Sequence, residues 1–165
     1  MPSKSAMGVE AGEVDRCMEQ AASAVLETMF FTGVDDTASG LHPGWQDDSR
    51  SWIRMRIEFA GPLVGDCQLQ IDREAARALA CTLLCLDPEE LRDEQPEQVA
   101  GELTNMICGF LLSHLEPDAN LTLGAPEIIE AAAAAGRLPG GVSRWFEIPE
   151  GSLAVDFRLS SQQAV

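Results

Sequence analysis

Residues 101–110, GELTNMICGF, place a carboxylate and a carboxamide three positions apart within a helical pattern. At about 100° per residue, Glu102 and Asn105 share one helix face with Gln98 and Gly109. Glycine is a poor helix former, and at position 109 it removes a side chain where a partner could approach. The spacing alone is compatible with a solvated helix edge or with a working site.

A second arrangement with possible chemistry is the pair Cys81 and Cys85, which are one helical turn apart and could in principle hold a metal. The only histidines are His42 and His114, and no paired CxxC is present. The five cysteines are odd in number, which favours reduced thiols in a reducing compartment over disulfides. A metal or thiol enzyme is therefore the least favoured hypothesis, and we expect no metal site.

The charge balance limits the partners of this 165-residue chain. It has 27 acidic and 11 basic residues, a formal net charge of −16. This field repels phosphate backbones and anionic lipid, so we expect neither nucleic acid nor a membrane as partner. It is compatible with a partner that offers a basic face. No apolar run is long enough to cross a bilayer and the N-terminus has no signal-peptide core, which predicts a cytoplasmic protein.

The spacing of apolar residues along the chain predicts the elements that position the polar pair. These elements form one domain over residues 13–160, between a disordered N-terminus (1–12) and a short tail (161–165). Asp72 and Asp87 are the expected helix caps. The expected elements are a helix over 14–31, a loop over 35–50, a hairpin over 51–72, a helix from 73, a short helix from 88, a long helix over about 97–115, a short strand within 120–129, a helical turn or loop over 130–141, and a second hairpin over 142–160.

This order predicts an α+β fold with a mostly antiparallel sheet covered by helices. Both halves run from a helix to strands, which indicates a pseudo-repeat. Within the long helix, the small residues Thr104 and Cys108 are expected to flank the polar pair. The apolar stripe expected to pack on the sheet comprises Val99, Leu103, Met106, Ile107 and Phe110.

GELTNMICGF followed by LTLGAPEII resembles the CheX/CheC/FliY family of chemotaxis phosphatases, most closely the single-site CheX type. The family pattern is Asp or Ser, three residues, Glu, two residues, Asn, and a later Pro. Glu102, Asn105 and Pro126 match its last three positions, and Gln98 stands at the first. The first helix has Glu27 but no Asn three residues later, so no second site of the CheC kind is expected.

The resemblance implies a CheC-like fold and hydrolysis of the aspartyl phosphate on a CheY-like response regulator that carries its own Mg²⁺. Asn105 would then position the attacking water, and Glu102 would pair with a cationic residue of the regulator. Gln98, Glu102 and Gly109 would contact this partner. The resemblance also implies a homodimer and no cofactor of the chain's own. The alternative is a non-catalytic module of the same fold that binds a response regulator or a flagellar switch component.

Overall fold

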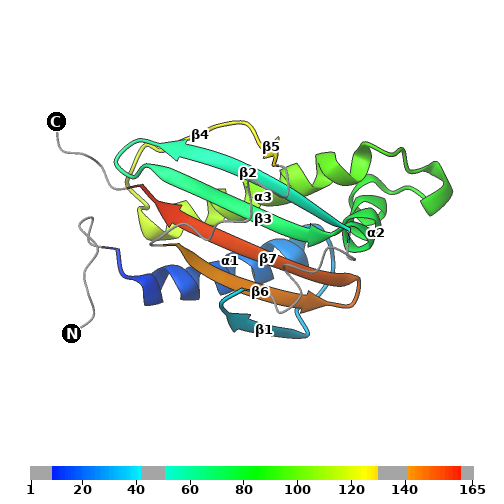
Figure 1. The fold of residues 1–165 in the computed structure, drawn as a ribbon, viewed down its shortest axis with the longest axis horizontal. Helices are drawn as coiled ribbons and strands as arrows, with labels where there is room; N and C mark the ends of the chain where they lie inside the picture. The colour runs from blue at the N-terminus through cyan, green and yellow to red at the C-terminus, as the bar shows by residue number, and fades with distance from the viewer. Residues whose placement is uncertain (1–8, 42–50, 130–140, 161–165) are drawn as a thin grey trace.

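The computed structural model describes residues 9–41, 51–129 and 141–160 as a single sheet with helices packed against it (Figure 1). No helix in these ranges combines the length and the apolarity that a bilayer crossing demands. The elements in chain order are α1 (Ala11–Met29), β1 (Asp36–Ser39), β2 (Trp52–Ala60), β3 (Gly65–Asp72), α2 (Arg73–Leu84), the 3-10 helix η1 (Pro88–Glu90), α3 (Gln95–Leu115), β4 (Thr122–Leu123), β5 (Glu127–Ile128), β6 (Val142–Ile148) and β7 (Gly151–Leu159).

All strand pairs in the sheet are antiparallel, in the order β1-β6-β7-β3-β2-β4, with β5 also paired to β2. The first half of the chain supplies α1 and strands β1 to β3, and the second half supplies α3 and strands β4 to β7. Strands β1, β2 and β3 of the first half correspond to β4 with β5, β6 and β7 of the second half. When each strand is replaced by its counterpart, the strand order of the sheet is the same order in reverse. The α+β fold is confirmed, and this symmetry supports the predicted pseudo-repeat.

The helices cover one face of the sheet. Figure 1 shows α1 and α3 lying behind the strands, with α2 at one end, and a single apolar core joins the helices to the sheet. Alternation along the strands explains this arrangement, because every second residue points to the helices. In β2 the core-facing residues are Ile53, Met55, Ile57 and Phe59, as the sequence predicts.

Both predicted caps are present. The Asp72 carboxylate accepts a hydrogen bond from the backbone N–H of Glu74 at 3.0 Å, and Asp87 forms a capping box with Glu90 at the start of η1. These side chains satisfy N–H groups that lack partners at a helix start. Asp72 thus marks the boundary between β3 and α2, and Asp87 marks the start of η1 after α2.

The structure differs from the sequence prediction at both ends of the first helix region. Helix α1 begins at Ala11 and Val9 is buried, so residues 9–12 belong to the folded part. The loop predicted over 35–50 contains strand β1, which pairs with β6. Residues 1–8, 42–50, 130–140 and 161–165 lie outside the described ranges, as does most of the segment predicted to be a helical turn or loop.

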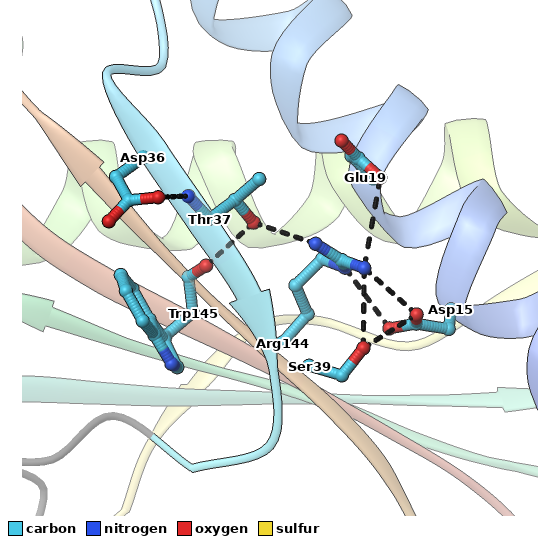
Figure 2. A network of polar contacts seen from close by, with 7 residues as sticks. All are labelled: Asp15, Glu19, Asp36, Thr37, Ser39, Arg144 and Trp145. Carbon is cyan, nitrogen blue, oxygen red and sulfur yellow. Dashed lines mark hydrogen bonds and ion pairs between the residues drawn. The ribbon is translucent and has the colours of Figure 1, made fainter.

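A polar network attaches α1 and β1 to β6 (Figure 2). The Arg144 guanidinium donates through Nε and Nη2 to the two carboxylate oxygens of Asp15, at 3.0 and 2.9 Å. It also donates to Thr37 and Ser39 of β1, and lies 3.7 Å from a carboxylate oxygen of Glu19. The Arg144 side chain is only 11% exposed, so Asp15 supplies the charge partner that such burial requires.

Candidate functional site

The predicted polar row, Gln98, Glu102, Asn105 and Gly109, lies along the outer face of α3. Gln98 and Glu102 are exposed, and Asn105 and Gly109 are half-buried. The other side of the helix is buried in the core through Pro96, Val99, Ala100, Gly101, Leu103, Thr104, Ile107, Cys108, Leu111, Leu112 and Leu115. The row is therefore presented by a rigid element, which favours accurate positioning of its side chains.

The core-facing side of α3 is wider than the predicted stripe. Met106 and Phe110 are only partly buried. Thr104 and Cys108, expected to flank the polar pair, instead point into the core. The Thr104 hydroxyl donates to the carbonyl oxygen of Ala100 at 2.7 Å, and a hydrogen bond with Cys108, together with burial, raises the pKa of the Cys67 thiol. These polar groups are satisfied internally and are not offered to a partner.

Glu102 and Asn105 are available for intermolecular contacts. Within the described ranges, no side chain is hydrogen-bonded or ion-paired to either of them. The first turn of α3 is acidic, and its Glu97 lies 3.6 Å from the Arg73 guanidinium. Glu97 is thus paired within the chain, whereas the exposed Glu102 is suited to receive a cation from a partner.

Strands β4 and β5 bring Pro126 onto α3. Leu123 lies opposite Phe59 of β2, and Glu127 lies opposite Arg56, so three residues of this segment face two residues of β2. The extra residue is a bulge, which suits a proline because the ladder needs no N–H there. The bulge places Pro126 against the helix at Gly101, directly before Glu102.

Gly101 gives this contact its close fit. A Cβ added at Gly101 would lie 3.3 Å from both Cβ of Pro126 and Cε of Met55. Asn105 is one helical turn further along the same side of α3. The Pro126 ring therefore packs against the helix turn that carries Glu102 and precedes Asn105, so the three residues of the sequence pattern lie in one region of the α3 surface. Gly101 is not among the residues predicted from the sequence, although a glycine inside an apolar helix indicates a packing or functional constraint.

Within the part of the chain that the structure describes, this face carries no metal-binding cluster. Among the residues it describes, no group of three or more His, Cys, Asp or Glu side chains could hold a metal ion. Cys81 is half-buried and Cys85 is exposed. The chemistry of the face is therefore that of one carboxylate, Glu102, and two carboxamides, Gln98 and Asn105. An amide can donate to and accept from a water molecule, and the carboxylate can bind a cation.

Comparison with known proteins places this geometry in a family. The family model described as chemotaxis phosphatase CheX matches residues 53–146, more than half of the chain and including the whole polar row. No curated protein sequence matches the chain.

Several solved structures share the fold. CheX from Desulfovibrio desulfuricans is 18% identical, with a TM-score of 0.66 over 90% of this chain and 99% of that chain. A CheX–CheY–BeF3–Mg complex from Borrelia burgdorferi is 18% identical, with a TM-score of 0.68 over 88% and 97%. FliY from Thermotoga maritima is 19% identical, with a TM-score of 0.56 over 88% and 86%. The family match, with the structures supporting the fold, leads to one assignment: the chain belongs to the CheX family of chemotaxis phosphatases.

Proposed function

We propose that this chain hydrolyses the aspartyl phosphate of a CheY-type response regulator, with Asn105 and Glu102 as the working pair. The observation that carries the proposal is the position of this pair: both side chains lie on a helix anchored in the core, without partners in the described ranges, beside Pro126. The CheX relative from Borrelia burgdorferi forms a complex with CheY, BeF3 and Mg²⁺, which supports a phosphorylated regulator as the substrate.

The reaction needs few catalytic groups from the phosphatase. Water attacks the phosphorus atom, the bond between phosphorus and the acyl oxygen breaks, the aspartate carboxylate of the regulator is restored, and inorganic phosphate is released. The leaving carboxylate is already a good leaving group, and Mg²⁺ held by the regulator neutralises the phosphoryl oxygens. What remains is to hold one water in line with the breaking bond. The Asn105 carboxamide can do this through its carbonyl oxygen and amide group without changing its own protonation state.

Glu102 is suited to a different task. A carboxylate next to a phosphoryl group is repelled, so direct contact with the reacting atoms is unfavourable. A cationic side chain of the regulator, such as a lysine beside the phosphorylated aspartate, gives the carboxylate a charge-assisted hydrogen bond. That contact fixes the register in which Asn105 meets the phosphoryl group.

Gln98 can join the same interface without charge. Its side chain is exposed one turn before Glu102, where the family pattern has Asp or Ser. An amide there can hydrogen-bond the regulator but cannot form an ion pair. This difference is the feature that favours the alternative function, a non-catalytic module that binds the same regulator.

The decisive experiment measures phosphate release from a Mg²⁺-loaded, phosphorylated CheY-type regulator of the same organism. Wild-type protein should accelerate release catalytically. Asn105→Ala should lower kcat by about 100-fold, since it removes the group that positions the water, while Kd for the BeF3-activated regulator stays within about threefold. Glu102→Ala should weaken that Kd by about tenfold or more.

A matched control is Glu27→Ala, which removes an exposed carboxylate from α1 and should change neither quantity. Release that is no faster with wild-type protein than without it, together with tight binding, would leave only the binding module. Absence of both binding and release would refute the regulator as partner.

We further infer that the chain forms a homodimer through an edge of the sheet. The two sheet edges are β1 on one side and β4 with β5 on the other. Edge strands present backbone groups that can pair with another strand. Because the β4–β5 edge also borders the proposed site, the β1 edge is the one that leaves Pro126 accessible to the regulator.

A further inference from the structure

A groove of about 180 Å³ opens between the C-terminal half of α3 and the β4 region, beside the polar row. Its apolar lining includes Leu112, Leu121 and Leu123, and its polar lining consists of Ser113 and Glu116. Gly109, the last member of the polar row, also lines it. The groove is therefore continuous with the face that carries Glu102 and Asn105.

The fold itself does not require a glycine at position 109. It lies within a regular helix, and an added Cβ would meet nothing nearer than Cδ1 of Leu123 at 3.8 Å, an ordinary contact distance. At Gly101, by contrast, the nearest atoms would be at 3.3 Å. Alanine at 109 would fit and would favour the helix. Glycine there keeps the groove open at a cost in helix stability.

We propose that this groove receives an aliphatic or aromatic side chain of the same response regulator whose phosphoryl group meets Asn105. The inference rests on the proposed function, because that function requires the regulator to cover Asn105. Gly109 is one turn, about 6 Å along the helix, from Asn105. A specific interface covers about 800 Å² per partner, a patch of about 16 Å radius, so a regulator seated on Asn105 must also cover the groove.

The chemistry of the groove selects the class of side chain. Three leucines, with Pro117 and Ala119, supply its apolar lining, and a volume near 150 Å³ is enough for a benzene ring. Glu116 and the carbonyl end of α3 make this region negative, which disfavours an acidic side chain. A buried apolar anchor next to a polar working pair is the usual composition of an interface centre.

The test adds a side chain at position 109, which lines the groove. Gly109→Ala should raise Tm by about 2–4 °C and weaken Kd for the Mg²⁺- and BeF3-loaded regulator by about threefold, because the helix gains stability while the groove loses depth. Gly109→Leu should weaken the same Kd by about tenfold or more. The kcat of bound complexes should stay within about threefold of wild type, which distinguishes docking from catalysis.

The control is Gly12→Ala on α1, where an added Cβ meets nothing within 4 Å. It should raise Tm by less than Gly109→Ala does, because Gly12 lies in the first turn of α1, and it should leave Kd unchanged. Wild-type affinity and turnover in Gly109→Leu would overturn the groove proposal and leave the phosphatase function intact. Failure of wild-type protein to bind the regulator would instead refute the proposed function, and the groove proposal with it.

A second measurement does not depend on how these variants fold. With methyl-labelled wild-type protein, the resonances of Leu121 and Leu123 should shift when the BeF3-loaded regulator is added to saturation. Asn105→Ala, which is expected to bind the regulator with near wild-type affinity and much lower turnover, should show the same shifts. Unchanged leucine methyl resonances in a saturated complex would show that no side chain enters the groove.

Discussion

At the scale of single residues, the site depends on a contact that contributes no chemistry. The bulge between β4 and β5 brings Pro126 against Gly101, directly before Glu102, where an added Cβ would lie 3.3 Å from the proline, a tight contact. The glycine costs about 1 kcal/mol of helix propensity relative to alanine. The close approach of the proline ring is the structural reason for accepting that cost.

Substitution of this glycine by a larger residue should damage both stability and turnover. Gly101→Val places methyl groups where Pro126 and Met55 already lie within 3.3 Å of an added Cβ, so overpacking should lower the free energy of unfolding by about 2 kcal/mol. The displaced proline should also lower kcat. Urea unfolding and phosphate release measure the two effects. Gly109→Ala is the control for stability, and an unchanged kcat in folded Gly101→Val would show that Pro126 has no part in turnover.

The members of the polar row could be predicted from the sequence because helical spacing is a local property. Four positions at intervals of four, three and four must share a face once the helix forms. In the structure Gln98 and Glu102 are exposed and Asn105 and Gly109 are half-buried, whereas the opposite side of α3 is buried. The seat of Pro126 at Gly101 could not be derived in this way, because it depends on a one-residue bulge and on the packing of segments far apart in sequence. The roles of Asn105 and Glu102 stay predictions.

At the scale of elements, strand β1 shows what local patterns cannot reveal. Its sequence, DTAS, has few strand-favouring residues and no large apolar side chain, so a loop was the natural expectation. This strand is stabilised by its pairing with β6 and by hydrogen bonds from Arg144 to the side chains of Thr37 and Ser39. The same arginine binds Asp15 of α1, so one side chain links three elements (Figure 2). The hairpins, by contrast, were predictable from alternation within each strand.

This link should make stability depend on pH in a defined window. Hydrogen bonds from Arg144 and from Ser39 hold the pKa of Asp15 below its usual value, against the opposing effect of burial. Its contribution is therefore fully present above the pKa of about 3.9 in the unfolded chain, and is lost as the pH falls through the lower native value. Wild type should exceed Asp15→Asn in free energy of unfolding by about 1–2 kcal/mol at pH 7, and by less at pH 3.

Urea unfolding at pH 7, 5, 4 and 3 measures that difference. Glu27→Gln, which neutralises an exposed carboxylate on the same helix, should differ little from wild type at every pH. Glu19, 3.7 Å from Arg144, also faces the network, so Glu19→Gln separates its contribution. A margin between wild type and Asp15→Asn that is independent of pH would contradict the assignment of the effect to the Asp15 carboxylate.

At the scale of the whole molecule, a symmetric framework carries an asymmetric surface. The two halves of the chain contribute corresponding strands to the sheet, and their helices α1 and α3 lie on the same face of it. On α3, Asn105 follows Glu102 by three residues and is half-buried at the surface. On α1, the residue three after Glu27 is Phe30, whose side chain belongs to the core. The repeat thus supplies two scaffolds, and only α3 presents the carboxylate–carboxamide pair.

The overall charge makes the proposed homodimer sensitive to salt. Each protomer carries a formal charge of −16, so two copies repel one another, and added salt screens that repulsion because the Debye length falls to about 10 Å at 0.1 M. The dimer dissociation constant should therefore fall by roughly threefold or more between 20 and 300 mM NaCl. Sedimentation at micromolar concentrations measures the shift from 17.8 kDa towards twice that mass. Sucrose at equal osmolality is the control, since it adds no ions. A mass of 17.8 kDa at every salt concentration would refute the dimer and would leave the proposed site on α3 unaffected.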